Sequence, residues 1–128
     1  MIIAQRSNLP AVCGRVCPHE RQCEGSCILG RKGQGIKIGK LERFIADMDG
    51  ELELVAPNVA KSQPGNIAVI GSGPAGLTVA GDLAKMGFKV TVFDSQPEAG
   101  GVLMYGIPEF RLPKQVVRRE VKRIKKLG

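Results

Sequence analysis

The 128-residue sequence predicts an α/β fold, in which a small, mostly helical segment with cysteines precedes a partial Rossmann-type βαβ unit. Two observations predict the βαβ unit. A short β-branched run from residue 67 leads into a glycine-rich turn and a stretch free of helix breakers, and a second apolar run ends at residue 94, within the length of one such unit. A third observation sets the first segment apart from this unit: all four cysteines lie before it, between positions 13 and 27.

The cysteine segment runs from Cys13 to Cys27, with three, five and three residues between successive cysteines. A disulfide framework spreads its cysteines along the chain, and the first residues lack a secretory signal, so we expect reduced thiols. Zinc sites usually pair their cysteines around a longer loop, so this spacing fits zinc less well. Several thiolates and a Cys-Pro pair on a short loop favour an iron–sulfur cluster, with zinc or reduced structural thiols as alternatives.

A helical repeat follows in the run 41–48. Its apolar positions have the i, i+3, i+4, i+7 spacing of a helix with one buried face: Leu41, Phe44, Ile45 and Met48. Two prolines and a Pro-Gly pair then indicate a linker over 55–66. We therefore expect a helical iron–sulfur (α-helical ferredoxin-like) part over 1–54 and the start of a dinucleotide-binding domain over 67–128.

The run 67–70 is wholly apolar, which is typical of a strand buried on both faces of a parallel sheet. The next stretch, 74–86, predicts a helix that ends at Gly87, and 89–94 predicts a second strand. The inward side of this helix is expected to hold Leu77, Ala80, Leu83 and Ala84.

Between the first strand and the helix stands the G-x-G-x-x-G arrangement of Gly71, Gly73 and Gly76. The first glycine permits the tight turn, the second lets a pyrophosphate approach the backbone, and the third allows close packing of helix on strand. Pro74 suits the first helical position, and the free N–H groups there attract a diphosphate. Asp94, at the end of the second strand, is placed to accept hydrogen bonds from an adenosine ribose. The pattern predicts dinucleotide binding.

The net charge of +7 is concentrated in a helix that starts at Pro113, because residues 114–128 hold seven bases and one acid. Val117, Val121, Ile124 and Leu127 are expected to face inward. With one Tyr, four Phe and no Trp, the chain lacks stacking platforms for bases, so we expect no nucleic-acid partner. No apolar run is long enough to span a membrane, and we expect a cytoplasmic protein with no membrane contact.

The segments 71–77, 100–108 and 110–113 resemble the FAD site of the NADPH-dependent glutamate synthase small (beta) subunit family, which includes the ferredoxin–NADP transhydrogenase large subunit and dihydropyrimidine dehydrogenase. The resemblance implies that the turn 71–76 holds the FAD diphosphate and Asp94 the ribose, with a carboxylate one methylene shorter than the usual Glu. The implied cofactor-binding residues are Gly71, Ser72, Gly73, Pro74, Ala75, Gly76, Asp94, Ser95, Gln96, Gly101, Val102 and Arg111.

In the same family, a segment similar to 13–27 helps to hold two [4Fe–4S] clusters. The resemblance implies that Cys17 and Cys23 serve one cluster and Cys27 the other. Cys13 is a metal candidate by residue type, although its position does not match a ligand. Glu42 matches a non-cysteine ligand, with a solvated helix-face carboxylate as the alternative. His19 is expected to be a surface residue beside the clusters.

The resemblance implies an oxidoreductase in which electrons pass from NADPH through FAD to the clusters, and then to a glutamate synthase large subunit-like or ferredoxin-like acceptor. The chain resembles an internal fragment of such an enzyme, with incomplete clusters and with NADPH bound by parts outside it. No set of acid–base or nucleophilic catalytic residues is present, so we expect no catalytic residue. We expect incomplete sheet edges and a homodimer that covers apolar surface. The alternative is a non-enzymatic module that holds zinc or one cluster and docks an acidic partner.

Overall fold

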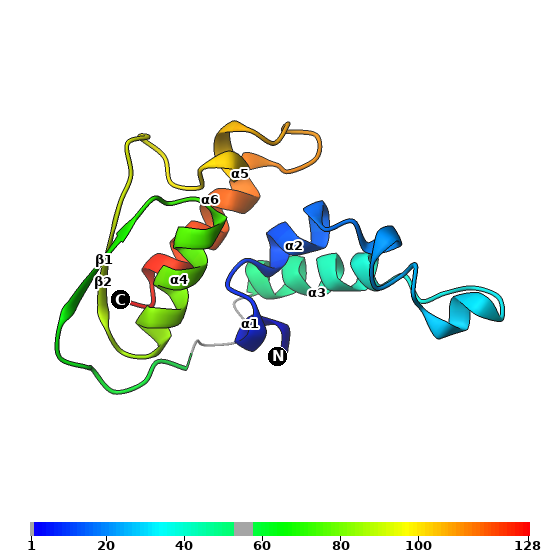
Figure 1. Ribbon diagram of the computed structural model, residues 1–128, viewed down its shortest axis with the longest axis horizontal. Helices are drawn as coiled ribbons and strands as arrows, with labels where there is room; N and C mark the ends of the chain where they lie inside the picture. The colour runs from blue at the N-terminus through cyan, green and yellow to red at the C-terminus, as the bar shows by residue number, and fades with distance from the viewer. Residues whose placement is uncertain (1, 53–57) are drawn as a thin grey trace.

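The computed structural model describes residues 2–52 and 58–128. Its elements lie in two groups along an elongated molecule (Figure 1). The first group contains the helices α1 (Ile2–Arg6), α2 (Pro10–Val16) and α3 (Ile38–Leu52) and the 3-10 helices η1 (His19–Arg21) and η2 (Ile28–Arg31). The second group contains β1 (Asn66–Ile70), α4 (Pro74–Lys85), β2 (Lys89–Phe93), α5 (Val102–Tyr105) and α6 (Lys114–Lys125).

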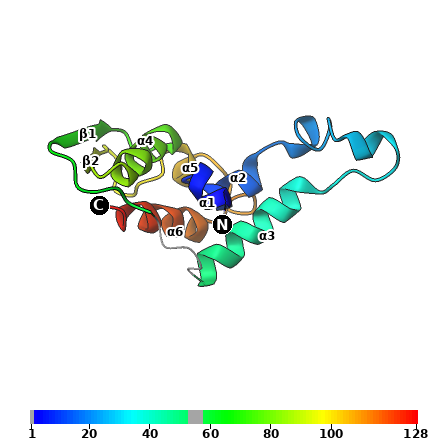
Figure 2. The ribbon, with the colours of Figure 1, turned by 90° about the horizontal axis from the view of Figure 1, so that it is seen from below.

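Helices α2 and α3 pack side by side, and the segment between them, 17–37, projects away from the βαβ unit (Figures 1 and 2). The two helices approach closely at Gly14, where an added Cβ would lie 2.8 Å from the Arg43 Cα. A glycine therefore sets the spacing of this pair. The projecting segment holds Cys17, Cys23 and Cys27 away from the dinucleotide turn.

Helix α3 is longer than the predicted run 41–48, and the prediction of its buried face was wrong. Phe44 is 62% exposed, and Leu41, Ile45 and Met48 are exposed as well. The buried side chains on this helix are instead Ala46 and Asp49. The reason is steric and electrostatic: α2 comes too close for large side chains, and α6 brings arginines that need acidic partners.

The βαβ unit agrees closely with the predicted segments. Strands β1 and β2 pair in parallel, with Ile67 opposite Val90 and Ile70 opposite Phe93, and α4 covers one face of this sheet. On α4 the buried residues include Leu77, Ala80 and Ala84, as predicted, whereas Leu83 is half-buried.

The prediction that the first strand is buried on both faces was wrong. Both strands alternate between exposed and half-buried residues, and Val69 lies on the half-buried face that points to α4. No other element of the described residues covers the opposite face. One face of the apolar strand β1 is therefore exposed to solvent in this structure.

Helix α6 lies against helices of both groups (Figure 2). One apolar cluster contains residues of both groups and of α6. Val117, Val121 and Ile124 are buried as predicted, while Leu127 lies beyond the helix and is half-buried. The cluster also includes Leu9, Ala11, Val12 and Ala46 from the cysteine half. The two parts predicted over 1–54 and 67–128 thus share one core, and their division into domains stays a prediction. Residues 55–57 of the predicted linker lie outside the described residues, and 58–65 form no helix or strand.

In the described part of the chain, no helix has both the length and the apolar character required to cross a bilayer.

Candidate functional site

The glycine turn between β1 and α4 has the geometry that its sequence predicts. Gly71 adopts a φ of +92°, which glycine tolerates and other residues rarely adopt, and its N–H donates to the Phe93 carbonyl at 2.7 Å. Gly76 lies against the Gly71 carbonyl so closely that an added Cβ would overlap it. Gly73 caps α4, and the space beside its Cα is open to 4 Å. The first turn of α4 is therefore accessible to a diphosphate.

Asp94 is held by donors from the same turn. Its Oδ2 accepts hydrogen bonds from the Ser72 backbone N–H and from the Ser72 hydroxyl, both at 2.6 Å, and its Oδ1 accepts from the Gln96 N–H at 2.8 Å. The Ser72 hydroxyl, followed by the backbone N–H groups, lowers the pKa of Asp94 to about 2. The carboxylate is therefore ionised at neutral pH and can only accept hydrogen bonds.

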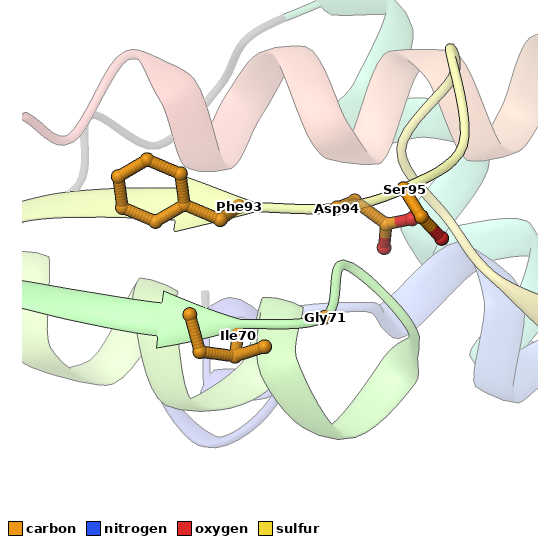
Figure 3. A pocket seen from close by; sticks show the side chains of 5 residues that line it. All are labelled: Ile70, Gly71, Phe93, Asp94 and Ser95. Carbon is orange, nitrogen blue, oxygen red and sulfur yellow. The ribbon is translucent and has the colours of Figure 1, made fainter.

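A hollow of about 370 Å³ opens at the carboxyl ends of the two strands (Figure 3). It is lined by Ile70, Gly71, Phe93, Asp94 and Ser95. Figure 3 shows the Asp94 carboxylate on the side of the Gly71 turn. Ligands of open parallel sheets bind at this edge, so the hollow lies where the ribose is expected.

The loop before α5 lies against the glycine turn. Gly100 N–H donates to the Ser72 carbonyl at 2.9 Å, and an added Cβ on Gly101 would lie 2.8 Å from the Gly73 Cα. Val102 follows at the exposed start of α5. The structure therefore brings Gly101 to the turn, and the cofactor-lining roles of Gly101 and Val102 stay predictions.

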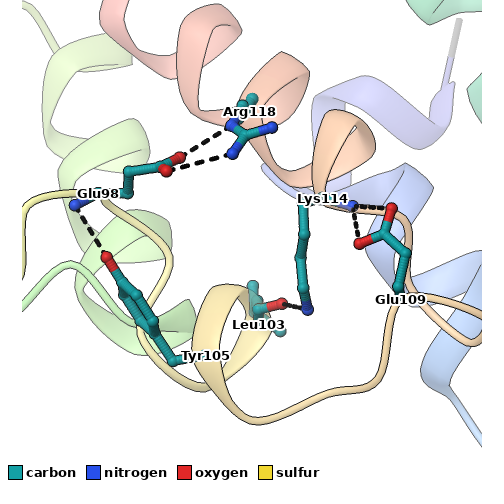
Figure 4. Close-up of polar contacts among 6 residues, drawn as sticks. All are labelled: Glu98, Leu103, Tyr105, Glu109, Lys114 and Arg118. Carbon is teal, nitrogen blue, oxygen red and sulfur yellow. Dashed lines mark hydrogen bonds and ion pairs between the residues drawn. The ribbon is translucent and has the colours of Figure 1, made fainter.

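Helix α6 and its flanking residues fix this loop (Figure 4). Arg118 donates to both carboxylate oxygens of Glu98, at 2.8 and 3.1 Å, and the Glu98 N–H donates to the Tyr105 hydroxyl. The Lys114 ammonium donates to the carbonyls of Leu103 and Ile107. The segment that approaches the glycine turn is thus tied to the rest of the fold at several points.

Arg111 is exposed, and its guanidinium lies 3.5 Å from the Val16 carbonyl at the end of α2. Its predicted role beside the flavin stays a prediction.

The four cysteines are free thiols in different surroundings. Burial raises the pKa of Cys13, which lies within α2. Desolvation and then the charge of Glu42 raise the pKa of Cys17. The backbone N–H groups of Ile36, Leu29 and Gly30 lower the pKa of Cys27, which immediately precedes η2.

These thiols do not converge on one point. Across residues 2–52 and 58–128, no three His, Cys, Asp or Glu side chains gather closely enough to hold a metal ion. The described residues therefore do not form a complete cluster or zinc site on their own, and the ligand roles of Cys13, Cys17, Cys23 and Cys27 stay predictions.

His19 is buried, with 8% of its surface exposed, so its prediction as a surface residue was wrong. Its Nε2 lies 2.8 Å from Glu42 Oε2, and its ring fills the space beside Gly39, where an added Cβ would lie 2.5 Å from Nδ1. The partly buried Glu42 is paired rather than freely solvated. Its ligand role stays a prediction. Helical spacing alone gave no sign of this pairing, because the two residues are 23 positions apart.

Comparison with known proteins finds two families along the chain. Residues 1–54 match the 4Fe-4S cluster domain II of dihydropyrimidine dehydrogenase. Residues 69–115 match an NAD(P)-binding Rossmann-like domain. The first match covers the cysteine-containing helices, and the second covers most of the βαβ unit and the loop with α5.

Individual relatives match nearly the whole chain. The putative oxidoreductase UacF of Escherichia coli K12 is 49% identical over 121 residues, which is 91% of this chain and 19% of the relative. The glutamate synthase [NADPH] small chain of the same organism is 47% identical over 120 residues, 91% of this chain and 25% of the relative. The NAD-dependent dihydropyrimidine dehydrogenase subunit PreT of Salmonella typhimurium is 39% identical over 126 residues, 98% of this chain and 30% of the relative. The chain thus spans about a fifth to a third of the length of these relatives.

Proposed function

We propose that this chain, which is similar to the glutamate synthase small chain and to PreT, is the region of an NAD(P)H-dependent iron–sulfur flavoprotein oxidoreductase where the FAD site adjoins the cluster domain. The observation that supports this proposal most directly is the glycine turn, residues 71–76, together with the Asp94 carboxylate beside it. It presents open backbone N–H groups to a diphosphate and an ionised carboxylate to a ribose.

The residues present fit the adenosine diphosphate half of FAD. The turn 71–76 would hold the diphosphate, and Asp94 would hold the ribose. Gly101, which has no side chain, would allow its loop to lie close to the turn beside the cofactor. When bound, FAD supplies redox chemistry that exchanges a hydride with NAD(P)H and single electrons with one-electron carriers. The chain positions and orients the cofactor.

For the clusters, we propose that Cys17, Cys23, Cys27 and Glu42 supply part of a ligand set that residues outside this chain complete. The match of residues 1–54 to a 4Fe-4S domain supports this proposal. The separation of the thiols within the described chain is consistent with shared rather than self-contained sites. The same separation gives no support to the zinc alternative.

The relatives are named as a small chain and a subunit, so we propose that the protein works with a partner subunit that accepts its electrons, either glutamate synthase large subunit-like or ferredoxin-like. The free thiols suit a reducing compartment, which supports the cytoplasm. A homodimer that covers the exposed side of α3 is a further part of the proposal.

The test is a titration of the purified chain with FAD, in which flavin fluorescence reports binding. Because the site holds the adenosine diphosphate half, ADP is expected to displace FAD, whereas FMN is not. Absence of FAD binding at millimolar concentration, or equal displacement by FMN, would contradict the proposed cofactor.

A further inference from the structure

Ser72 is buried, with 2% of its surface exposed, although it stands in a turn that is otherwise open to solvent and to ligand. A polar side chain at such a position needs hydrogen-bond partners, because a buried hydroxyl without them is destabilising. The partners that Ser72 makes define its role.

The Ser72 hydroxyl stands in the middle of a directed chain of hydrogen bonds. Gly100 N–H, which also donates to the Ser72 carbonyl, lies 3.3 Å from Ser72 Oγ, and Ser72 Oγ donates to Asp94 Oδ2 at 2.6 Å. The direction is fixed at both ends, because a backbone N–H can only donate and an ionised carboxylate can only accept. One side chain therefore connects the glycine turn, the end of β2 and the loop before α5.

The contact also fixes the carboxylate. Asp94 Oδ2 receives two donors from Ser72, while Oδ1 receives the Gln96 N–H. Because Ser72 lies in the loop after β1 and Gln96 in the loop after β2, rotation of the carboxylate would break at least one of these short hydrogen bonds. The remaining surface of Asp94 faces the hollow at the strand ends (Figure 3).

We propose that Ser72 is a positioning residue, whose hydroxyl holds Asp94 in the orientation that accepts the vicinal ribose hydroxyls of an adenosine nucleotide. The proposal rests on the dinucleotide site proposed above and adds a role for the residue between the first two glycines. In this role Ser72 acts through Asp94 and not by contact with the diphosphate.

The fold is expected to tolerate loss of the hydroxyl. In Ser72→Ala, the Ser72 backbone N–H still reaches Asp94 and the Gly100 N–H still reaches the carbonyl of residue 72. Thr78→Ala is the matched control, since it removes another hydroxyl near the turn, one that donates to the Pro74 carbonyl at 2.8 Å and not to Asp94.

The experiment measures the affinity of wild type and both variants for ADP and for 2′,3′-dideoxyadenosine diphosphate. Wild type is expected to prefer ADP. Ser72→Ala is expected to lose about five- to tenfold in ADP affinity, which lies within the range for one ordinary hydrogen bond, with dideoxy-nucleotide affinity unchanged. Thr78→Ala should keep the wild-type ratio. An equal loss for both nucleotides, or no loss for ADP, would overturn the positioning role.

A second measurement needs no ligand and separates this inference from the proposed function. Carbon-13 NMR of the Asp94 carboxyl should show its pKa rising toward the usual range in Ser72→Ala and staying low in Thr78→Ala. If wild type binds neither nucleotide, the proposed dinucleotide function fails while the titration still decides the Ser72–Asp94 link. An Asp94 pKa that is the same in wild type and Ser72→Ala overturns the inference.

Discussion

Arg123 of α6 donates to Asp49 of α3 at 2.6 Å, and the Asp49 side chain is fully enclosed at this contact. Beside it, Arg15 of α2 and Arg119 of α6 both donate to Asp47, at 2.9 and 3.2 Å. The pairs made by Arg119 and Arg123 join α6, in the βαβ half, to α3 in the cysteine half, whereas the Arg15–Asp47 pair joins α2 to α3 within the cysteine half. The two halves are therefore expected to unfold together.

We predict that Asp49→Asn destabilises the chain by about 3 kcal/mol, the lower end of the cost of breaking a buried pair, because Arg123 is partly exposed. Urea unfolding followed by circular dichroism measures the change. Glu98→Gln is the control, since its pair with Arg118 is exposed and its loss should leave the unfolding midpoint nearly unchanged. Equal effects of the two substitutions would show that the Asp49 contact is not buried in solution.

Glu120 predicts a pH dependence of stability. It is fully buried, neither carboxylate oxygen has a hydrogen-bond partner, and burial raises its pKa to about 7 against the opposing charges of Arg123 and Arg119. Because the native carboxyl binds its proton more tightly than the unfolded one, this contribution is most favourable below pH 4.5. It is lost as the pH rises through 7.

The expected loss from Glu120 is about 3 kcal/mol between pH 4.5 and 8. Unfolding free energies at pH 5 and pH 8 measure it, and Glu120→Gln should remove this part of the slope. Glu109→Gln, which changes an exposed carboxylate, should keep the wild-type slope. A wild-type slope retained in Glu120→Gln would contradict the assignment.

Sequence patterns were sufficient for the βαβ unit because its constraints are local. The glycine spacing, the lengths of the apolar runs and the acid at the second strand end all lie within 28 residues. Each constraint also acts on the backbone, so its effect does not depend on what packs nearby. The relation of Ser72 to Asp94 was not predictable, because a serine between two glycines gives no signal of burial.

Patterns failed where distant elements decide the environment. The apolar face of α3 reads as buried, but the neighbours α2 and α6 leave room only for small side chains and acids at the contact. The sequence indicates only that Glu120 is the one acid on a basic helix. In the structure it lies among Arg15, Asp49 and Arg123, which come from three helices. His19 gave no pattern at all, because its partner Glu42 is on another helix.

The orientation of α3 gives a third prediction. Phe44→Asn should change stability by less than about 0.5 kcal/mol, because the ring is exposed, whereas Ala46→Asn should cost about 2 kcal/mol or more, because no space surrounds the buried methyl group. Thermal unfolding compares the two at a protein concentration at which the chain is monomeric, so that a change in dimerisation does not contribute to the melting temperature. If the predicted apolar face were inward, the order of the two effects would reverse. Light scattering adds a test of the homodimer, which Phe44→Asn should weaken.

The last prediction distinguishes two roles within the glycine turn, the packing of α4 on the strand by Gly76 and the access of the diphosphate to the backbone at Gly73. Gly76→Ala should destabilise the chain by about 2 kcal/mol, because its Cβ would overlap the Gly71 carbonyl and push α4 off the strand. Gly73→Ala should fold almost normally, since its φ of −68° is ordinary and nothing lies within 4 Å of the added Cβ. It should still weaken FAD binding at least tenfold, because the methyl group occupies the space through which a diphosphate reaches the backbone. Melting temperature and FAD titration, measured on both variants, distinguish a packing glycine from a ligand-facing one. Unchanged FAD affinity in a folded Gly73→Ala variant would mean that the diphosphate does not approach the chain at this turn.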